Sequence, residues 1–95
     1  MRAADLLTIL ANTPRKKQYQ NILLEKSQKY QPLTAVTEND SHALVFVFEE
    51  NKVALPTKDL LILLMKHREK EIYYQLDQNI LPLYGVKELD NDLIV

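Results

Sequence analysis

The sequence predicts an α+β fold: two N-terminal helices, a three-stranded antiparallel meander, one long helix and a short extended segment at the C-terminal end (α-α-β-β-β-α, with a final β-strand as an option). Three observations support this prediction. Apolar residues recur at helical spacing to about residue 30, alternate between residues 33 and 55, and return to helical spacing from residue 57. The length of 95 residues corresponds to one domain, residues 1–95.

Apolar spacing and helix-start residues define the two predicted N-terminal helices. Spacing of i, i+3, i+4 and i+7 predicts a short amphipathic helix over residues 3–11. Thr13 before Pro14 suits the start of a second helix, because threonine accepts from a free backbone N–H and proline lacks only an unused donor. This helix is expected to run to about Lys29 and to end before Pro32. Its core face would contain Tyr19, Ile22, Leu23, the stem of Lys26 and Tyr30.

Alternation at residues 33–37 and short apolar runs within residues 42–48 and 53–55 predict three strands, joined by turns at residues 38–41 and 49–52. The strand at 42–48 is unusual because residues 43–48 (ALVFVF) contain no polar residue. Both of its faces are therefore expected to need cover.

The long helix is predicted from Thr57, a suitable N-cap, to about residue 79, before Pro82. Asp59 would lie in its first turn, where the helix dipole favours a carboxylate. Residues 60–65 (LLILLM) are apolar all round, whereas the second half of the helix is amphipathic. Residues 93–95 (LIV) are expected to form an edge strand or a docking tail.

Composition excludes several function classes. The chain has no cysteine, which rules out disulfides, thiol nucleophiles and cysteine-ligated zinc and favours the cytoplasm. Its single glycine, Gly85, argues against phosphate-binding loops, dinucleotide-binding turns and nucleophile elbows. The start does not resemble a signal peptide, and residues 60–65 are far short of the roughly 20 needed to span a bilayer. We expect no cofactor and no membrane contact.

Candidate catalytic and metal-binding residues are few. Ser41 and His42 are adjacent, but neighbours on an extended chain point to opposite faces, which is unfavourable for a nucleophile and its base. His67 and Glu71 have the spacing of one helical face and could contribute to a metal site, although a solvated face with ion pairs explains them better. The turn acids Asp40, Glu49 and Glu50 have no calcium-loop spacing.

No catalytic motif rises above background, so we expect a non-enzymatic protein. The enzymatic alternative is a metal-independent ribonuclease that uses Arg68, His67 and either Tyr73 or Tyr74, because general acid and base catalysis needs only a few positioned groups. The spacing of these residues does not itself indicate that chemistry.

A second alternative is a small nucleic-acid-binding regulator. The formal net charge is −1, but residues 1–30 carry +4 and the remaining residues carry −5. Cations at a helix start oppose the helix dipole and suit phosphate, and Tyr19 could stack on a base. The residues that would bind phosphate are Arg15, Lys16, Lys17, Lys26 and Lys29.

Protein–protein interaction is the favoured function. The strand at 43–48 and the helix segment at 60–65 both require burial on every side, and so short a chain offers little to cover them. We therefore expect a protein partner, most simply a second copy in a two-fold dimer, as in a small regulator, adaptor, inhibitor or immunity-type protein. The predicted interface residues are Val45, Val47, Leu60, Leu63 and Leu64.

Overall fold

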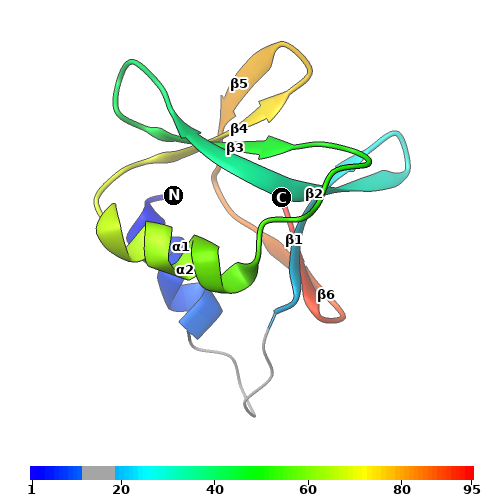
Figure 1. Ribbon diagram of the computed structural model, residues 1–95, viewed down its shortest axis with the longest axis horizontal. Helices are drawn as coiled ribbons and strands as arrows, with labels where there is room; N and C mark the ends of the chain where they lie inside the picture. Colours follow the sequence, from blue (N-terminus) through cyan, green and yellow to red (C-terminus); the bar gives the residue numbers. More distant parts are fainter. Residues whose placement is uncertain (12–18) are drawn as a thin grey trace.

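The computed structural model describes residues 1–11 and 19–95. Two helices lie against the concave side of a mixed seven-stranded sheet that curls into a half-barrel (Figure 1). The elements are α1 (Ala3–Ala11), β1 (Asn21–Lys26), β2 (Lys29–Glu38), β3 (Leu44–Phe48), α2 (Thr57–Lys66), β4 (Ile72–Leu76), β5 (Asn79–Pro82), β6 (Lys87–Leu89) and β7 (Asp92–Ile94). The strand order across the sheet is β5-β4-β3-β2-β1-β7-β6.

The predicted layout of two helices, a meander and a long helix is wrong, although helices and strands are both present. The first helix is confirmed as α1, but the described part of the second forms β1 and the start of β2. Ser27 and Gln28 make the tight turn between these strands with φ of 51° and 66°. Positive φ at both positions is typical of a type I′ hairpin turn, which glycine or asparagine usually signals. The turn contains neither glycine nor asparagine. The sequence therefore contained no sign of a turn, and the helical spacing of the surrounding apolar residues predicted a helix instead.

The predicted long helix is also wrong beyond residue 66. His67 leaves helical geometry, with φ −130° and ψ 40°, and its N–H bonds to the carbonyl of Leu64. Residues 72–82 then form the β4–β5 hairpin, in which Asp77 has a φ of 56°. The apolar residues that suggested an amphipathic helical half therefore belong to strands.

Only part of the predicted meander is present. β2 and β3 pair antiparallel, as predicted, but residues 53–55 do not form a strand. The second neighbour of β3 is instead β4, which pairs with it in parallel. The C-terminal apolar residues form β7, which lies between β1 and β6 rather than at an edge of the sheet.

The apolar strand β3 is covered by its own chain. Leu44, Phe46 and Phe48 belong to the buried core together with residues of both helices. Val45, on the other face of β3, is 3% exposed because the strands on either side place Thr37 and Tyr73 beside it. The central position of β3 therefore supplies the two-sided cover that its sequence requires.

The two edges of the sheet belong to one stretch of chain. β5 and β6 are the outermost strands, yet only residues 83–86 separate them in sequence (Figure 1). This short connection requires the sheet to curl until its edges approach each other. The helices fill the interior of the curl, where Leu6, Leu60 and Leu64 are each at most 2% exposed.

The chain repeats itself at an interval of fifty residues. Residues 21–33 (NILLEKSQKYQPL) and 71–83 (EIYYQLDQNILPL) form the two hairpins with the same register, so that Leu23 lies opposite Pro32 as Tyr73 lies opposite Pro82. The two segments share four residues at matching positions: Ile22 and Ile72, Gln28 and Gln78, Pro32 and Pro82, and Leu33 and Leu83.

The helices before the hairpins repeat as well. Residues 5–10 of α1 read DLLTIL and residues 59–64 of α2 read DLLILL. Each places an aspartate in its first turn and buries the leucine that follows it, Leu6 in α1 and Leu60 in α2. The first unit is therefore α1 with β1, β2 and β3, and the second is α2 with β4, β5, β6 and β7.

The two units exchange strands reciprocally. The first strand of each unit pairs in parallel with the last strand of the other: Ile22 of β1 lies opposite Leu93 of β7, and Ile72 of β4 lies opposite Leu44 of β3. In the second unit, β5 and β6 together take the place of the continuous β2.

No helix in the described ranges is long and apolar enough to cross a bilayer.

Candidate functional site

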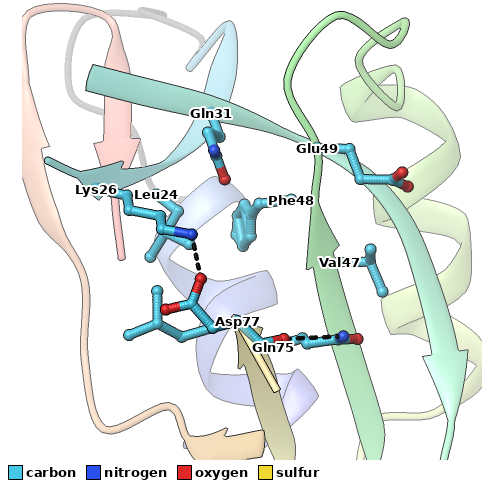
Figure 2. A pocket seen from close by; sticks show the side chains of 9 residues that line it. Leu24, Lys26, Gln31, Val47, Phe48, Glu49, Gln75 and Asp77 are labelled. Atoms are coloured by element: carbon cyan, nitrogen blue, oxygen red, sulfur yellow. Dashed lines mark hydrogen bonds and ion pairs between the residues drawn. The ribbon is translucent and has the colours of Figure 1, made fainter. Parts of the chain in front are cut away.

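The ends of β1, β3 and β4 surround a hollow of about 380 Å³ (Figure 2). The amine of Lys26 in β1 pairs with the carboxylate of Asp77, which joins the tips of the two hairpins. The side-chain amide of Gln75 donates a hydrogen bond to the carbonyl of Asp77 (3.3 Å). The described lining residues are Leu24, Lys26, Gln31, Val47, Phe48, Glu49, Gln75, Leu76 and Asp77.

The charged groups of this hollow are already paired within the chain. Glu49, on the other side of the hollow from Lys26 in Figure 2, bonds to Lys52 Nζ (2.6 Å) and accepts from the Thr34 hydroxyl (3.2 Å). The Lys52 ammonium is the main reason that the pKa of Glu49 lies below its usual value. The described lining consists of apolar side chains, amides and paired charges, and no nucleophile lies beside a base in it.

The Ser41 and His42 pair lies beside a larger hollow of about 580 Å³. His42 Nδ1 contacts Glu38 Oε1 (2.8 Å), while the Ser41 backbone N–H donates to Asn39 Oδ1 (2.9 Å). Lys70 Nζ donates to the second Glu38 oxygen (2.8 Å). These two bonds, that of Lys70 first, lower the pKa of Glu38 from 4.5 to about 2. The contact with Glu38 occupies only one ring nitrogen of His42, but no hydrogen bond joins the described Ser41 hydroxyl to the ring, so the structure does not show the nucleophile–base contact of an activated serine.

His67 and Glu71 do not share a helical face, because α2 ends at Lys66. Glu71 instead contacts the N-terminal ammonium (3.6 Å) and Arg2 Nε (3.7 Å). Asp40 and Glu50 are exposed turn residues. Within the described residues, no group of three histidine, aspartate or glutamate side chains is close enough to hold a metal.

The residues of the ribonuclease alternative are divided between different surroundings. His67 and Arg68 line a hollow of about 440 Å³ at the end of α2. Tyr73 lines the neighbouring hollow beside His42, and Tyr74 packs against the core. The structure therefore does not bring these groups together around one reacting position.

The basic residues of the nucleic-acid alternative are only partly placed. Arg15, Lys16 and Lys17 lie outside the described residues. Lys26 is paired with Asp77, and Lys29 is exposed at the β1–β2 turn rather than on a helix.

Tyr19, the residue expected to stack on a base, is engaged by another side chain. Its hydroxyl donates a hydrogen bond to Glu88 Oε2 (2.7 Å). This bond is the main reason that the pKa of Tyr19 lies above 10.0, because it favours the protonated phenol.

The predicted interface residues are mostly inside the protein. Leu60, Leu64 and Val45 are 2%, 0% and 3% exposed, whereas Leu63 and Val47 are half-buried. A partner would therefore meet Leu63 and Val47 before it met the other three.

Sequence reasoning missed the apolar residues of α2 that do reach the surface. Ile62 is 47% exposed and Met65 is 55% exposed. Together with the exposed Lys58 they follow the i, i+4, i+7 spacing of one helical face, and we call Lys58, Ile62 and Met65 the α2 stripe. The signal that could have found it is the match between DLLTIL at residues 5–10 and DLLILL at residues 59–64, because aligning the two helices separates positions that the fold buries from positions that it leaves outside.

At the two apolar positions of the stripe, the helices differ in chemistry but not in exposure. Aligned through DLLTIL and DLLILL, Thr8 matches Ile62 and Ala11 matches Met65, and all four residues are exposed. The Thr8 hydroxyl donates to the Ala4 carbonyl within its own helix (2.9 Å). The fold therefore accommodates small or polar residues at these positions.

Comparison with known proteins gives no assignment: no family model, no curated protein and no solved structure matches the chain.

Proposed function

We propose that the protein is a non-enzymatic protein–protein interaction module that acts through the α2 stripe, with a second copy of the chain as its partner. The observation that carries the proposal is the difference between the helices: Ile62 and Met65 are exposed on α2 where α1 has Thr8 and Ala11. Because the matched positions of α1 are occupied by polar or small residues, the two neighbouring exposed apolar residues of α2 support a contact role for this helix.

The energetic gain from covering the stripe is modest. Burying the exposed parts of Ile62 and Met65 would contribute roughly 1 kcal/mol for each side chain, and a two-fold contact would bury both sets. The half-buried Leu63 borders the stripe and could add to the contact. We therefore expect weak association that depends on protein concentration, as for small interfaces in general.

A second copy is favoured as the occupant by the charges around the stripe. Lys58 and Asp59 lie at its beginning, and Lys66, Arg68 and Glu69 follow its end. A surface that carries both signs at both ends can complement itself, whereas a partner of one dominant sign would meet like charges at each end.

The experiment transplants the α1 residues onto α2. We expect the average mass of the native chain, measured by light scattering after size exclusion, to rise from the 11.1 kDa monomer towards twice that value with concentration. Ile62→Thr with Met65→Ala should keep the protein monomeric over the same range. Its thermal unfolding should change little, because both substitutions are at exposed positions.

The control is Thr8→Ala, which changes the matching exposed position of α1 and should leave association unaltered. Equal masses for the native chain and the double variant at every concentration would contradict the proposal. Loss of association accompanied by unfolding would also count against it, since the stripe would then be needed by the fold itself.

A further inference from the structure

The parallel pairing of β3 and β4 stops before either strand ends. Its last pair joins Phe46 to Tyr74, whereas β3 continues to Phe48 and β4 continues to Leu76. The residues beyond the last pair all line the hollow of about 380 Å³ (Figure 2): Val47, Phe48, Gln75 and Leu76. The two strands therefore diverge at their carboxyl ends and leave this space between them.

The diverging strands present backbone groups as well as side chains to the hollow. In a parallel ladder, N–H and C=O groups of each strand point towards its neighbour. No pair joins β3 to β4 beyond Phe46 and Tyr74, so the groups that point across the gap have no ladder partner on these two strands. Crevices outside the carboxyl ends of parallel strands are also where ligands bind in open α/β sheets.

Gln31 has unused hydrogen-bonding capacity at this site. It is half-buried in β2, and Figure 2 shows its amide pointing into the hollow. The amide makes no hydrogen bond to another described residue. Its counterpart fifty residues later is Leu81 in β5, which is also half-buried. The second hairpin thus forms with an apolar residue at this position, and the amide of Gln31 is available to a ligand.

The charges of the lining favour a neutral ligand. Lys26 is paired with Asp77, and Glu49 is paired with Lys52. An ionic ligand would lose hydration on entering and would find no unpaired group of opposite charge in the described lining. A purely apolar ligand would remove water from the amide of Gln31 without replacing its hydrogen bonds, which is also unfavourable. The ligand that fits is neutral and carries both a donor and an acceptor.

We propose that this hollow binds a neutral planar ring with a neighbouring hydrogen-bond donor and acceptor, the edge that adenine presents. A glutamine amide complements this edge, because its oxygen accepts from the amino group while its nitrogen donates to a ring nitrogen. The apolar side chains of Leu24, Phe48 and Leu76 suit the faces of the ring. The volume lies within the range of small-molecule sites, roughly 300–1,000 Å³. No described lining residue belongs to α2, so the proposal is independent of self-association.

The test is a titration of the full chain with adenosine, followed by amide NMR. We expect saturable shifts within residues 24–31, 47–49 and 75–77, and none along α2. Purine riboside has the same ring system without the amino group. It should bind roughly tenfold more weakly, because the glutamine oxygen loses its donor. Equal affinities for the two nucleosides, or the absence of saturable shifts with adenosine, would overturn the proposal.

Variants of Gln31 test the assignment of the amide. Gln31→Leu introduces the residue that the second hairpin has at the matching position, and it should weaken adenosine binding roughly tenfold. Gln31→Glu keeps the size of the side chain but replaces the donor nitrogen with a charged oxygen, and it should weaken binding similarly. Gln20→Leu, just before the start of β1, is the matched control and should bind as the native chain does. Thermal unfolding checks each variant, and Gln31→Glu decides if Gln31→Leu does not fold.

The same ring could come from a free nucleoside or from a single-stranded nucleic acid, and a further probe distinguishes the two sources. A free nucleoside as ligand predicts that a short oligoadenylate binds no more tightly per base than adenosine. A nucleic acid as the source predicts that the oligoadenylate binds more tightly and that added salt weakens its binding. Gln31→Leu should reduce the affinity in either case. Binding of both probes that is insensitive to the Gln31 variants would contradict the site.

Discussion

The two units of the molecule share one plan of folding but present different surfaces. Both bury the leucine after the first-turn aspartate of the helix, and both close their hairpins in the same register. On the exposed side of the helix, however, the first unit has Thr8 and Ala11 where the second has Ile62 and Met65. The buried positions and the hairpin register, which the fold requires, are the same in both units, whereas the exposed helix positions differ.

The units also differ in how their long strand runs. β2 is one continuous strand of ten residues in the middle of the sheet. Its counterpart is divided into β5 and β6, which form the two edges, with the exposed Tyr84 and Gly85 between them. Because the divided strand has to connect both edges, the second unit carries the part of the sheet that is most open to solvent.

The largest expected effect tests whether the matched buried positions are equivalent. Leu6→Ala and Leu60→Ala should each lower the free energy of unfolding by about 3 kcal/mol, because both side chains are at most 2% exposed and truncation leaves a cavity. Chemical denaturation measures both variants. Lys58→Ala, at an exposed position, is the control and should change stability little. A large loss for only one leucine would show that the two helices do not contribute equally to the core.

A smaller effect is expected at the hairpin turns. The first turn holds both Ser27 and Gln28 at positive φ, whereas in the second turn the non-glycine residue at positive φ is Asp77. Ser27→Asn with Gln28→Gly should raise the free energy of unfolding by about 0.5–1 kcal/mol, because these residues favour a type I′ turn.

Asp77→Gly is the matched substitution in the second hairpin. It should gain less than the exchange in the first turn, since aspartate tolerates positive φ and the pairing of its carboxylate with Lys26 would be lost. A greater gain at Asp77 than at the first turn would reverse the expected order of strain between the hairpins.

The smallest expected effect concerns two carboxylates at matching positions, Glu38 and Glu88. Glu38 bonds to Lys70 and His42, which lowers its pKa from 4.5 to about 2. A lowered pKa in the folded state gives stability that is present above pH 4.5 and is lost as the pH falls towards 2. Glu38→Gln should therefore flatten the acid side of a stability–pH profile.

The matching contact in the second unit acts at the other end of the pH range. The bond from Tyr19 to Glu88 raises the pKa of the phenol above 10.0. A raised pKa gives stability that is present below pH 10.0 and is lost at higher pH. Tyr19→Phe should flatten the alkaline side of the profile, and an alkaline side that does not change would contradict the contribution of this bond.

Local sequence patterns predicted the elements whose ends are marked by turn or cap residues. α1 was predicted with the correct bounds, and the strands around residues 33–48 were found because their apolar residues alternate or run without interruption. The hairpins were predicted as helices. In the first hairpin, Ile22 and Leu24 alternate with other residues, but the same segment also has apolar residues at helical spacing, and no glycine marks the Ser27–Gln28 turn. Proline at matching positions, Pro32 and Pro82, would have indicated that both segments share one structure.

The interface residues in α2 were predicted from the overall hydrophobicity of residues 60–65, whereas the helical spacing of the buried positions was needed to identify those that reach the surface. Residues 60–65 are all apolar, so their composition alone could not distinguish the buried Leu60 and Leu64 from the exposed Ile62 and Met65. The DLLTIL segment of α1 contains that information, because its threonine marks the position that faces solvent.

The measurement that tests the central claim most directly is a dilution series followed by amide NMR on the native chain. It reports on α1 and α2 in the same sample, so each helix serves as a control for the other. We expect concentration-dependent shifts at residues 58–69, which contain the α2 stripe and its flanking charges, and none along α1. Shifts of equal size in both helices, or spectra that do not change with concentration, would contradict the claim that the two units differ in their capacity for contact.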